Sequence, residues 1–515
     1  MSPDQPPLPF IAMATQVHVA FLWHMHQPWY ALPGSADNLL PWTRLRATKD
    51  YTDMAVWLER WPVPVTVNFT PSLTEQLRRY ADGTLSDLYL PSRSQPHALA
   101  DLRAGYVPLP VARRGLPTPD VARVRSATGE EGERALWGWS LLSWSGQSAL
   151  EGNRDLRALW EMGAFSPADL AALEDVHRRA LADVLPRYRR LAADGGIELS
   201  STPFYHPILP LLLDSGIALR SQPDDEIPPF SASADAREQV RRALCHHGDT
   251  FGARPSGMWP AEGALSNAAA GVCAQAGVRW LSTDGGVLSH SLGRAPAPEE
   301  LYRPWRVTSP EGEIAVLFRD TFLSNRISFD YHAWRPEDAA ADLLHRFGEI
   351  GRAWRGSRPP LVLIAMDGEN AWEFYDRNGA PFFSALYRGL ETGIGIVPTT
   401  VSDYLDRFGS DILLPDLWPG SWIDANFRTW IGHPAQNRAW RLLAAAERAV
   451  AEAPPGPEQD RAREHLLVAE GSDWFWWYGP HHASPHEPVF DRLFRGHIAH
   501  AYQEIGTPTP SDLFA

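Results

Sequence analysis

Short apolar runs that end in polar residues recur along the first 370 positions of the chain. They fall within residues 17–28, 63–73, 195–212, 277–286, 312–320 and 360–370. Each passes from apolar residues to a charged or polar residue and then to a turn or loop, a pattern that predicts buried strands with polar tips. Helical patterns lie between them, for example at 167–196 and 234–248.

A strand, a polar tip and a helix, repeated in this order, predict a parallel α/β barrel. The carboxyl-terminal ends of the strands meet at one face of such a barrel, and the active site lies there. We therefore expect an α/β fold in which the polar strand ends converge on one site.

The last quarter of the chain has a different pattern. Amphipathic helices with short links are expected at 433–453, 457–471 and 486–506. We place the barrel in residues 1–410, with a helical and loop insertion near 75–165, and a helical domain in 411–515. Within the insertion, the polar, Gly- and Pro-rich stretch 103–133 is predicted to be a long surface excursion.

Composition narrows the function classes. The net charge is −15 and no basic run is present, which makes nucleic acid and anionic membranes poor partners. Two cysteines far apart argue against a disulfide framework or a cysteine-based zinc site. The first residues show neither a signal-peptide pattern nor a membrane-spanning pattern, so we expect a cytoplasmic protein.

Tryptophan is unusually frequent, with 22 residues, and it clusters with His, Asp and Glu. Many of these rings will fill the core. Sugar rings, however, present C–H faces that stack on indoles, and their hydroxyls bond to carboxylates and amides. The combination of tryptophan and acidic residues therefore points towards a carbohydrate ligand.

Two carboxyl groups are the candidate catalytic pair. Asp367 directly follows the apolar run "LVLIAM" (361–366), and Glu262 lies in "GMWPAEGALS" (257–266), three residues after Trp259. Two carboxylates on either side of a glycosidic bond cleave it when one attacks the anomeric carbon and the other protonates the leaving oxygen. Glu373, which lies near Asp367, is better explained as part of a solvated turn that caps the next helix than as a catalytic acid.

A second candidate group is "HMHQPWY" (24–30). His24 and His26 are two positions apart, so both side chains lie on one side of an extended segment. They are compatible with two ligands of a zinc site, with Asp284 or His206 as a further ligand. They equally suit hydrogen bonds to sugar hydroxyls, with Trp29 stacking on the ring.

Other polar strand ends and the tail add candidates. Glu198 and His206 lie in the third run, and Arg319 and Asp320 close another, although an adjacent Arg–Asp pair is more often a structural salt bridge. The tail segments 419–434 and 470–482 are dense in tryptophan and acids, and we expect some of these aromatic residues to line the cleft.

Five blocks in order resemble glycoside hydrolase family 57, whose members act on α-glucans such as starch and glycogen. They are "HMHQP" (24–28), "GGIELSSTPFYHP" (195–207), "GMWPAEGALS" (257–266), "AMDGENAWE" (365–373) and "AEGSDWFWWYG" (469–479). The resemblance implies an incomplete (β/α)7 barrel with a C-terminal helical domain, and a retaining mechanism without metal or cofactor. It implies that Glu262 is the nucleophile and Asp367 the general acid/base. The predicted substrate contacts are His24, His26, Trp29, Glu198, His206, Trp259, Arg319, Glu369, Trp372, Trp422, Asp473 and Trp476.

The fourth block also bears on the subgroup. Branching enzymes of the family have a pattern similar to D-x-E-L-F-G-H-W-W, whereas "DGENAWE" is more similar to the α-amylase and amylopullulanase side. We expect a hydrolase of α-1,4 bonds first and of α-1,6 bonds second. The alternatives are a 4-α-glucanotransferase using the same residues, a metal-dependent barrel hydrolase or deacetylase, and a non-catalytic glucan-binding protein.

Overall fold

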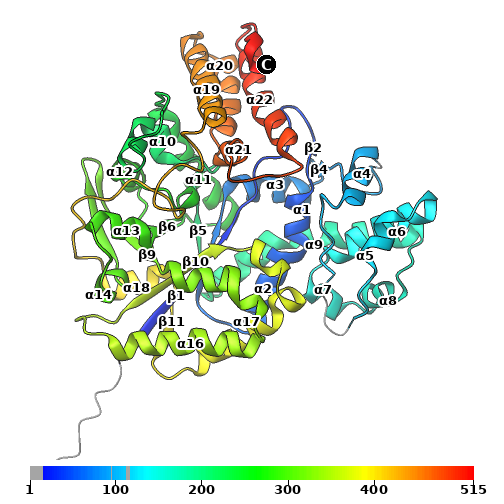
Figure 1. The fold of residues 1–515 in the computed structure, drawn as a ribbon, viewed down its shortest axis with the longest axis horizontal. Coiled ribbons are helices and arrows are strands. Elements are labelled where there is room, and N and C mark those ends of the chain that lie inside the picture. The colour runs from blue at the N-terminus through cyan, green and yellow to red at the C-terminus, as the bar shows by residue number, and fades with distance from the viewer. Residues whose placement is uncertain (1–14, 94, 112–115, 515) are drawn as a thin grey trace, which may run out of the picture.

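Seven parallel strands form the frame of the molecule (Figure 1). The computed structural model describes residues 15–93, 95–111 and 116–514. In spatial order the strands are β10 (Leu361–Asp367), β1 (Val17–Met25), β3 (Val65–Phe69), β5 (Ile197–Ser201), β6 (Gly257–Met258), β7 (Trp280–Asp284) and β9 (Gly312–Arg319). The antiparallel β8 (Trp305–Ser309) flanks β9, and β11 (Ile396–Pro398) pairs with the start of β1. A separate pair joins β2 (Asp37–Asn38) to β4 (Ser86–Asp87).

The barrel is incomplete between β9 and β10. Within the described residues no strand ladder joins these two strands, and the sheet runs from β10 round to β8. The backbone N–H of Asp320 donates to the carbonyl of Leu363 at 2.8 Å, and the Arg319 guanidinium donates to the carbonyl of Ala365 at 2.9 Å. These two bonds bridge the seam, and the predicted incomplete (β/α)7 barrel is confirmed.

The alternation of side chains along β1 explains the burial of all nine of its residues. Phe21 and Trp23 pack outward against the surrounding helices. Leu22 points inward and packs with Trp280 and Leu363, so the barrel is filled by side chains. His24, two residues beyond Leu22, therefore also points into the barrel, and it lies where the strands end.

Helices cover the outside of the barrel. They are α1 (Trp42–Arg46), α2 (Thr52–Arg60), α3 (Pro71–Ala81), α9 (Pro167–Ala193), α10 (Leu209–Leu213), α11 (Ser233–Phe251), α12 (Asn267–Gln275), α13 (Gly285–Leu292), α14 (Pro298–Leu301), α15 (Thr321–Asn325), α16 (Pro336–Ala353), α17 (Ala380–Thr392) and α18 (Val401–Phe408). No helix of the described part is long and apolar enough to cross a bilayer.

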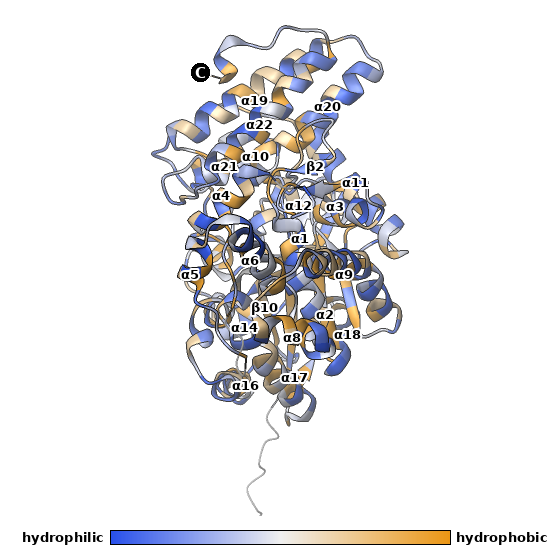
Figure 2. Cartoon of the chain, turned by 90° about the vertical axis from the view of Figure 1, so that its right-hand side faces the viewer, coloured by the Kyte–Doolittle hydropathy of each residue, from blue (hydrophilic) through white to orange (hydrophobic). Residues whose placement is uncertain are grey.

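The C-terminal portion is helical, as predicted. It comprises α19 (Pro434–Glu452), α20 (Pro457–Ala469), α21 (Ser472–Trp477) and α22 (Glu487–Glu504), which stand together at the top of Figure 1. Hydrophobic and hydrophilic residues alternate along α19 and α22 in Figure 2, as expected for helices with one buried face. The division at residue 410 remains a prediction.

The stretch 103–133, predicted to be a surface excursion, lies in the insertion that was placed near residues 75–165 and contains helices as well as loops. A helical group occupies this part of the chain: α4 (Pro96–Ala104), α5 (Val121–Ser126), α6 (Gly129–Ser143), α7 (Gln147–Gly152) and α8 (Arg154–Met162). Helix α6 already begins at Gly129, because Leu136, Trp139 and Leu142 bury one of its faces. Residues 112–115 of this stretch lie outside the described residues.

Candidate active site

A cavity of about 1090 Å³ opens at the carboxyl-terminal ends of the strands. This volume is slightly above the usual range of about 300–1,000 Å³ for small-molecule sites, which suits an oligosaccharide. Its wall is built from the end of β1, the end of β10, the short helix η3 (Ala261–Gly263) and the tail. The predicted residues that line it are His24, His26, His206, Glu262, Arg319, Asp367, Glu369, Trp422, Asp473 and Trp476.

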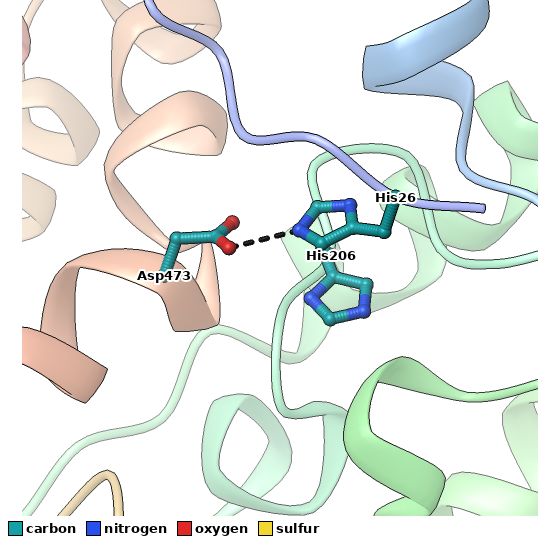
Figure 3. A group of neighbouring side chains, drawn as sticks. All are labelled: His26, His206 and Asp473. Atoms are coloured by element: carbon teal, nitrogen blue, oxygen red, sulfur yellow. Dashed lines mark hydrogen bonds and ion pairs between the residues drawn. The ribbon is translucent and has the colours of Figure 1, made fainter. Parts of the chain in front are cut away.

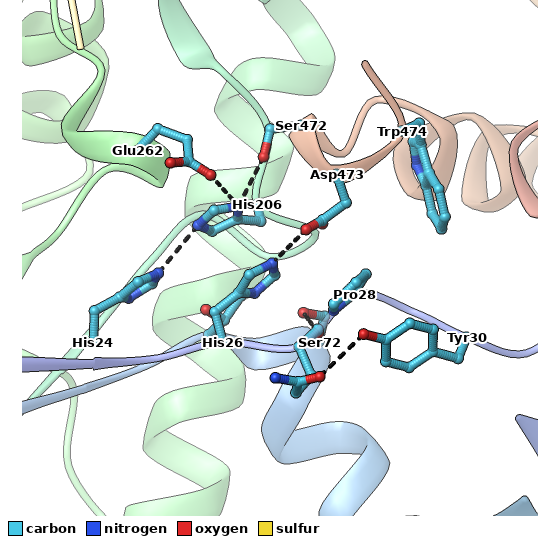
Figure 4. A network of polar contacts seen from close by, with 12 residues as sticks. His24, His26, Pro28, Tyr30, Ser72, His206, Glu262, Ser472, Asp473 and Trp474 are labelled. Carbon is cyan, nitrogen blue, oxygen red and sulfur yellow. Dashed lines mark hydrogen bonds and ion pairs between the residues drawn. The ribbon is translucent and has the colours of Figure 1, made fainter. Parts of the chain in front are cut away.

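Glu262 reaches the cavity through an unusual backbone turn. Its φ of 58° and ψ of 23° lie in the left-handed region, which an ordinary residue adopts at a cost of about 1 kcal/mol or more. The indole Nε1 of Trp422 donates to Oε2 of Glu262 at 2.8 Å, and Nδ1 of His206 lies 4.0 Å from Oε1 (Figure 4). The turn therefore holds the carboxyl group between the tail and the barrel.

Asp367 is the last residue of β10 and pairs in register with His24 of β1. It has the inward parity of Leu363 and Ala365, which explains why its side chain lines the cavity. Burial, followed by the charge of Asp367, raises the pKa of Glu262 to about 8. The two carboxyl groups are therefore electrostatically coupled, and a pKa of about 8 places a proton on Glu262 at neutral pH.

A directional chain of hydrogen bonds runs through two histidines. Nδ2 of Asn68 donates to the carbonyl of Ser201 at 2.6 Å, which fixes its Oδ1 as an acceptor. Nδ1 of His24 lies 2.7 Å from this oxygen and must donate to it.

Burial lowers the pKa of His24 to about 3 and that of His206 well below its usual value, so both rings are neutral. Nε2 of His24 therefore accepts from Nε2 of His206 at 3.2 Å, and Nδ1 of His206 accepts from the Ser472 hydroxyl at 2.8 Å. This assignment leaves no imidazolium beside Glu262, so Trp422 is the group that donates to its carboxylate.

His26 and Asp473 form the neighbouring contact. Nε2 of His26 donates to Oδ1 of Asp473 at 2.8 Å, and the ring of His26 stacks on that of His206 with centroids 3.7 Å apart and planes 14° apart (Figure 3). The three residues could hold a metal by proximity alone, since their ligand atoms lie within 4.8 Å of one another. An ion bound to both stacked rings, however, would lie outside both ring planes, where imidazole has no lone pair. The arrangement suits hydrogen bonding better than the predicted zinc alternative.

A further acid lies against Asp367. Glu369 is only 4% exposed, and Nε2 of Gln27 donates to its Oε1 at 3.3 Å. Burial and the charge of Asp367 raise the pKa of Glu369 well above its usual range. Arg46 balances the acids of this wall through a 2.6 Å ion pair with Glu373.

Arg319 lines the cavity and is held in place by an ion pair with Asp284. Its Nε donates to Oδ2 of Asp284 at 2.6 Å, and its guanidinium lies 4.9 Å from the Trp422 ring centroid. The sequence suggested a pair between Arg319 and its neighbour Asp320, but Asp320 instead accepts a hydrogen bond from the backbone N–H of Leu323 and caps α15. Because Arg319 and the Thr321 hydroxyl both donate to Asp284, its carboxylate is already engaged and does not suit the zinc ligand considered from the sequence.

Glu198 and Trp259 do not line the cavity. Glu198 faces inward but pairs in register with Thr66, one layer below His24 and Asn68, and Thr66, Trp280 and Ser402 donate to its carboxylate. Trp259 is 0% exposed and packs edge-on beneath Trp422, with centroids 5.1 Å apart. Trp259 therefore supports Trp422 instead of presenting a face to a sugar.

Trp29 and Trp372 also lie away from the cavity wall. Trp372 is 1% exposed, donates from Nε1 to the carbonyl of Gly368 and packs against Phe383 in the outer core. Trp29 is half-buried and makes an edge contact with Tyr205. Both rings stabilise the segments that carry the site.

Several lining residues were not predicted. Gln27 lies inside the first block and could have been proposed from it, as could Trp477 from the last block. Arg46, Phe329 and Phe374 also line the cavity, but no pattern of the sequence marks them.

Paired carboxyl groups in a cavity at the mouth of a parallel barrel, with aromatic walls, are typical of enzymes that cleave glycosidic bonds. The family model of glycosyl hydrolase family 57 matches residues 20–414, and the chain belongs to this family.

Solved structures give the same fold at low identity. The α-amylase AmyC from Thermotoga maritima has a TM-score of 0.61 at 13% identity, covering 97% of this chain and 95% of its own. A branching enzyme from Pyrococcus horikoshii has a TM-score of 0.60 at 16% identity, covering 96% and 93%. The 4-alpha-glucanotransferase from Thermococcus litoralis has a TM-score of 0.56 at 15% identity, covering 95% of this chain and 60% of its own. No curated protein matches the chain.

Proposed function

We propose that the protein is a retaining α-glucan hydrolase that cleaves α-1,4 bonds, with α-1,6 bonds as a second linkage. Glu262 is the nucleophile and Asp367 the general acid/base. The observation that carries the proposal is that both carboxyl groups line one cavity and that the charge of Asp367 shifts the pKa of Glu262. The family and the names of the similar structures, among them an α-amylase, support the α-glucan substrate.

In the first step Glu262 forms a bond to the anomeric carbon, while the bond to the leaving oxygen breaks and Asp367 supplies its proton. In the second step water attacks the anomeric carbon, Asp367 takes its proton and Glu262 is released. A single proton shared by the pair meets the requirement for one ionised and one protonated carboxyl group. The hydrogen bond from Trp422 stabilises the ionised form of Glu262.

The walls of the cavity supply groups for sugar recognition. Asp473 and Glu369 offer hydrogen-bonding oxygen atoms, and His26 offers ring nitrogens. Trp422 and Trp476 offer aromatic surface. The α-amylase or amylopullulanase type and the cytoplasmic location remain predictions from the sequence.

A 4-α-glucanotransferase is the second candidate, because it uses the same covalent intermediate. A sugar hydroxyl then replaces water in the second step, and apolar surface near the acceptor favours this outcome by excluding water. Phe329 and Phe374, which line the cavity and are 69% and 67% exposed, provide such surface.

The test is a product analysis over time with maltoheptaose. Only shorter sugars are expected for hydrolysis, whereas sugars both longer and shorter than the input establish transfer. Asp367→Asn and Glu262→Gln are each expected to lose product formation, with an unchanged melting temperature as the control for folding. Near-normal turnover by Glu262→Gln contradicts the assignment of the nucleophile.

A further inference from the structure

Exposed aromatic side chains gather beside the cavity. Phe322, Phe329, Trp334 and Phe374 are 56%, 69%, 43% and 67% exposed. Three of them lie within thirteen consecutive residues, and Phe374 contacts His332 of the same segment with ring centroids 5.8 Å apart. Single exposed apolar residues are ordinary, but a group of them marks a binding surface.

The segment that carries these rings also forms part of the cavity wall. Helix α15 continues into the π-helix η4 (Arg326–Asp330) and then into η5 (Tyr331–Ala333). Asn325, Ser328 and Phe329 line the cavity. A π-helical turn is uncommon and is often found at functional sites. The outer rings are therefore continuous along the chain with the proposed substrate site.

Arg326 holds the outer rings in position. Its guanidinium lies 5.6 Å from the ring centroid of Phe322 and 5.0 Å from that of Trp334. Ion pairs to Asp330 at 3.4 Å and Asp342 at 3.5 Å fix the guanidinium in turn. Rings that are held in place yet remain about half exposed bind a ligand with little loss of side-chain freedom.

We propose that Phe322 and Trp334, together with Phe329 and Phe374, form an outer strip that binds the part of an α-glucan chain outside the cavity. This inference rests on the proposed function. A neutral chain that fills the cavity and leaves it meets Phe329 and Phe374 first, because both line the cavity and are exposed. The C–H faces of successive glucose units then stack on Phe322 and Trp334.

The first arm of the test measures binding without turnover. Glu262→Gln is combined with Phe322→Ala and Trp334→Ala, and migration is measured in native gels that contain amylose. Retardation by amylose is expected in the Glu262→Gln protein and is expected to be largely lost in the triple variant. Phe514→Ala removes another exposed aromatic ring, 67% exposed near the end of the chain, and is the matched control.

The second arm uses the active protein. Phe322→Ala/Trp334→Ala is expected to raise KM for amylose by at least about two- to tenfold, the effect of losing one aromatic stacking contact. KM for maltotriose, which fits inside the cavity, is expected to stay unchanged, and Phe322→Tyr/Trp334→Phe is expected to restore the wild-type KM for amylose.

Unchanged retardation in the triple variant, or no retardation of the Glu262→Gln protein, overturns the outer strip. A dimer of the wild type in sedimentation that Phe322→Ala/Trp334→Ala converts to monomer also overturns it, because the rings then contact a second copy. If retardation is lost in the triple variant but the wild type turns over no glucan, the outer strip is supported and the proposed function is contradicted.

Discussion

The indole nitrogen of Trp422 donates a 2.8 Å hydrogen bond to the carboxyl group of Glu262. Trp422 lies beyond residue 414, where the match to the family model ends. The tail also supplies Ser472 to His206 and Asp473 to His26. The barrel therefore carries both proposed catalytic carboxyl groups, but the C-terminal portion completes their surroundings.

The first prediction concerns this hydrogen bond. Trp422→Phe keeps an aromatic ring between Trp259 and Arg319 but removes the donor to Glu262. A hydrogen bond to a charged group contributes about 1.5–3 kcal/mol, so kcat is expected to fall roughly 10- to 100-fold. Trp418→Phe is the control, because its indole donates to the backbone carbonyl of Ala425 and not to a carboxyl group. Equal kcat values for Trp422→Phe and wild type contradict this role.

The second prediction concerns the coupling of the two carboxyl groups. For a substrate whose leaving group needs no proton, only Glu262 must be ionised, and its pKa is raised to about 8, so kcat/KM is expected to rise with pH towards 8. Asp367→Asn removes the neighbouring negative charge, which lowers the pKa of Glu262 and moves this limb to lower pH. α-Maltosyl fluoride is the substrate to use, because fluoride leaves without a proton from Asp367. If kcat/KM rises over the same pH range in the wild type and in Asp367→Asn, the two carboxyl groups are not coupled.

The third prediction concerns the histidine chain. The bond directions require a proton on Nδ1 of His24 and on Nε2 of His206. Nitrogen-15 spectra of labelled histidine are expected to show these two tautomers and no protonation of either ring at pH 6. Ser472→Ala removes the donor to Nδ1 of His206, but the bond to His24 still requires the proton on Nε2, so only the chemical shift of the unprotonated Nδ1 is expected to change. Ser472→Thr keeps the hydroxyl, and its spectrum is expected to match the wild type.

The strands and the proposed catalytic pair follow from the sequence because their signals are local. β10 is an apolar run that ends at Asp367, so the position of this acid at the barrel mouth is readable from one segment. β6 has only two residues, too few for any periodicity, and was not predicted as a strand. Likewise, no periodic feature of the first 60 residues marks Arg46 as part of the cavity wall.

The depth of a side chain in the barrel is not a local property. Alternation assigns Glu198 and His24 to the inward side, but only the register of β1, β3 and β5 reveals that Glu198 lies one layer lower. Similarly, Trp259 was predicted to stack on a sugar, and the tail residue Trp422 covers it. Strand register and the path of a distant tail depend on the whole fold, so these two positions could not be predicted.

The last prediction concerns stability and a group of three acids between the barrel helix α11 and the C-terminal helices. Asp235 on α11, Glu447 on α19 and Glu470 at the end of α20 have carboxyl oxygens within 4.8 Å of one another. Arg463 pairs with Asp235 at 3.4 Å, and Gln239 donates to Glu470 at 2.8 Å. One guanidinium cannot balance three buried charges, so the folded protein must hold protons here.

Burial, followed by the charge of Asp235, raises the pKa of Glu447 to about 8, from about 4.5 in the unfolded chain. The folded state therefore binds a proton that the unfolded state releases between these pH values. The resulting stabilisation is fully present below pH 4.5 and is lost as the pH rises through 8. From this group alone, the free energy of unfolding is expected to fall by at most about 1.4 kcal/mol per pH unit.

Urea unfolding at pH 5.5, 7.0 and 8.5 measures this slope. Glu447→Gln keeps the shape of the side chain without the charge, so its unfolding free energy is expected to depend less on pH and to exceed the wild-type value at pH 8.5. Glu452→Gln, on the exposed end of the same helix, is the control and is expected to follow the wild type. Parallel slopes for Glu447→Gln and wild type would show that Glu447 is not the acid that holds the proton.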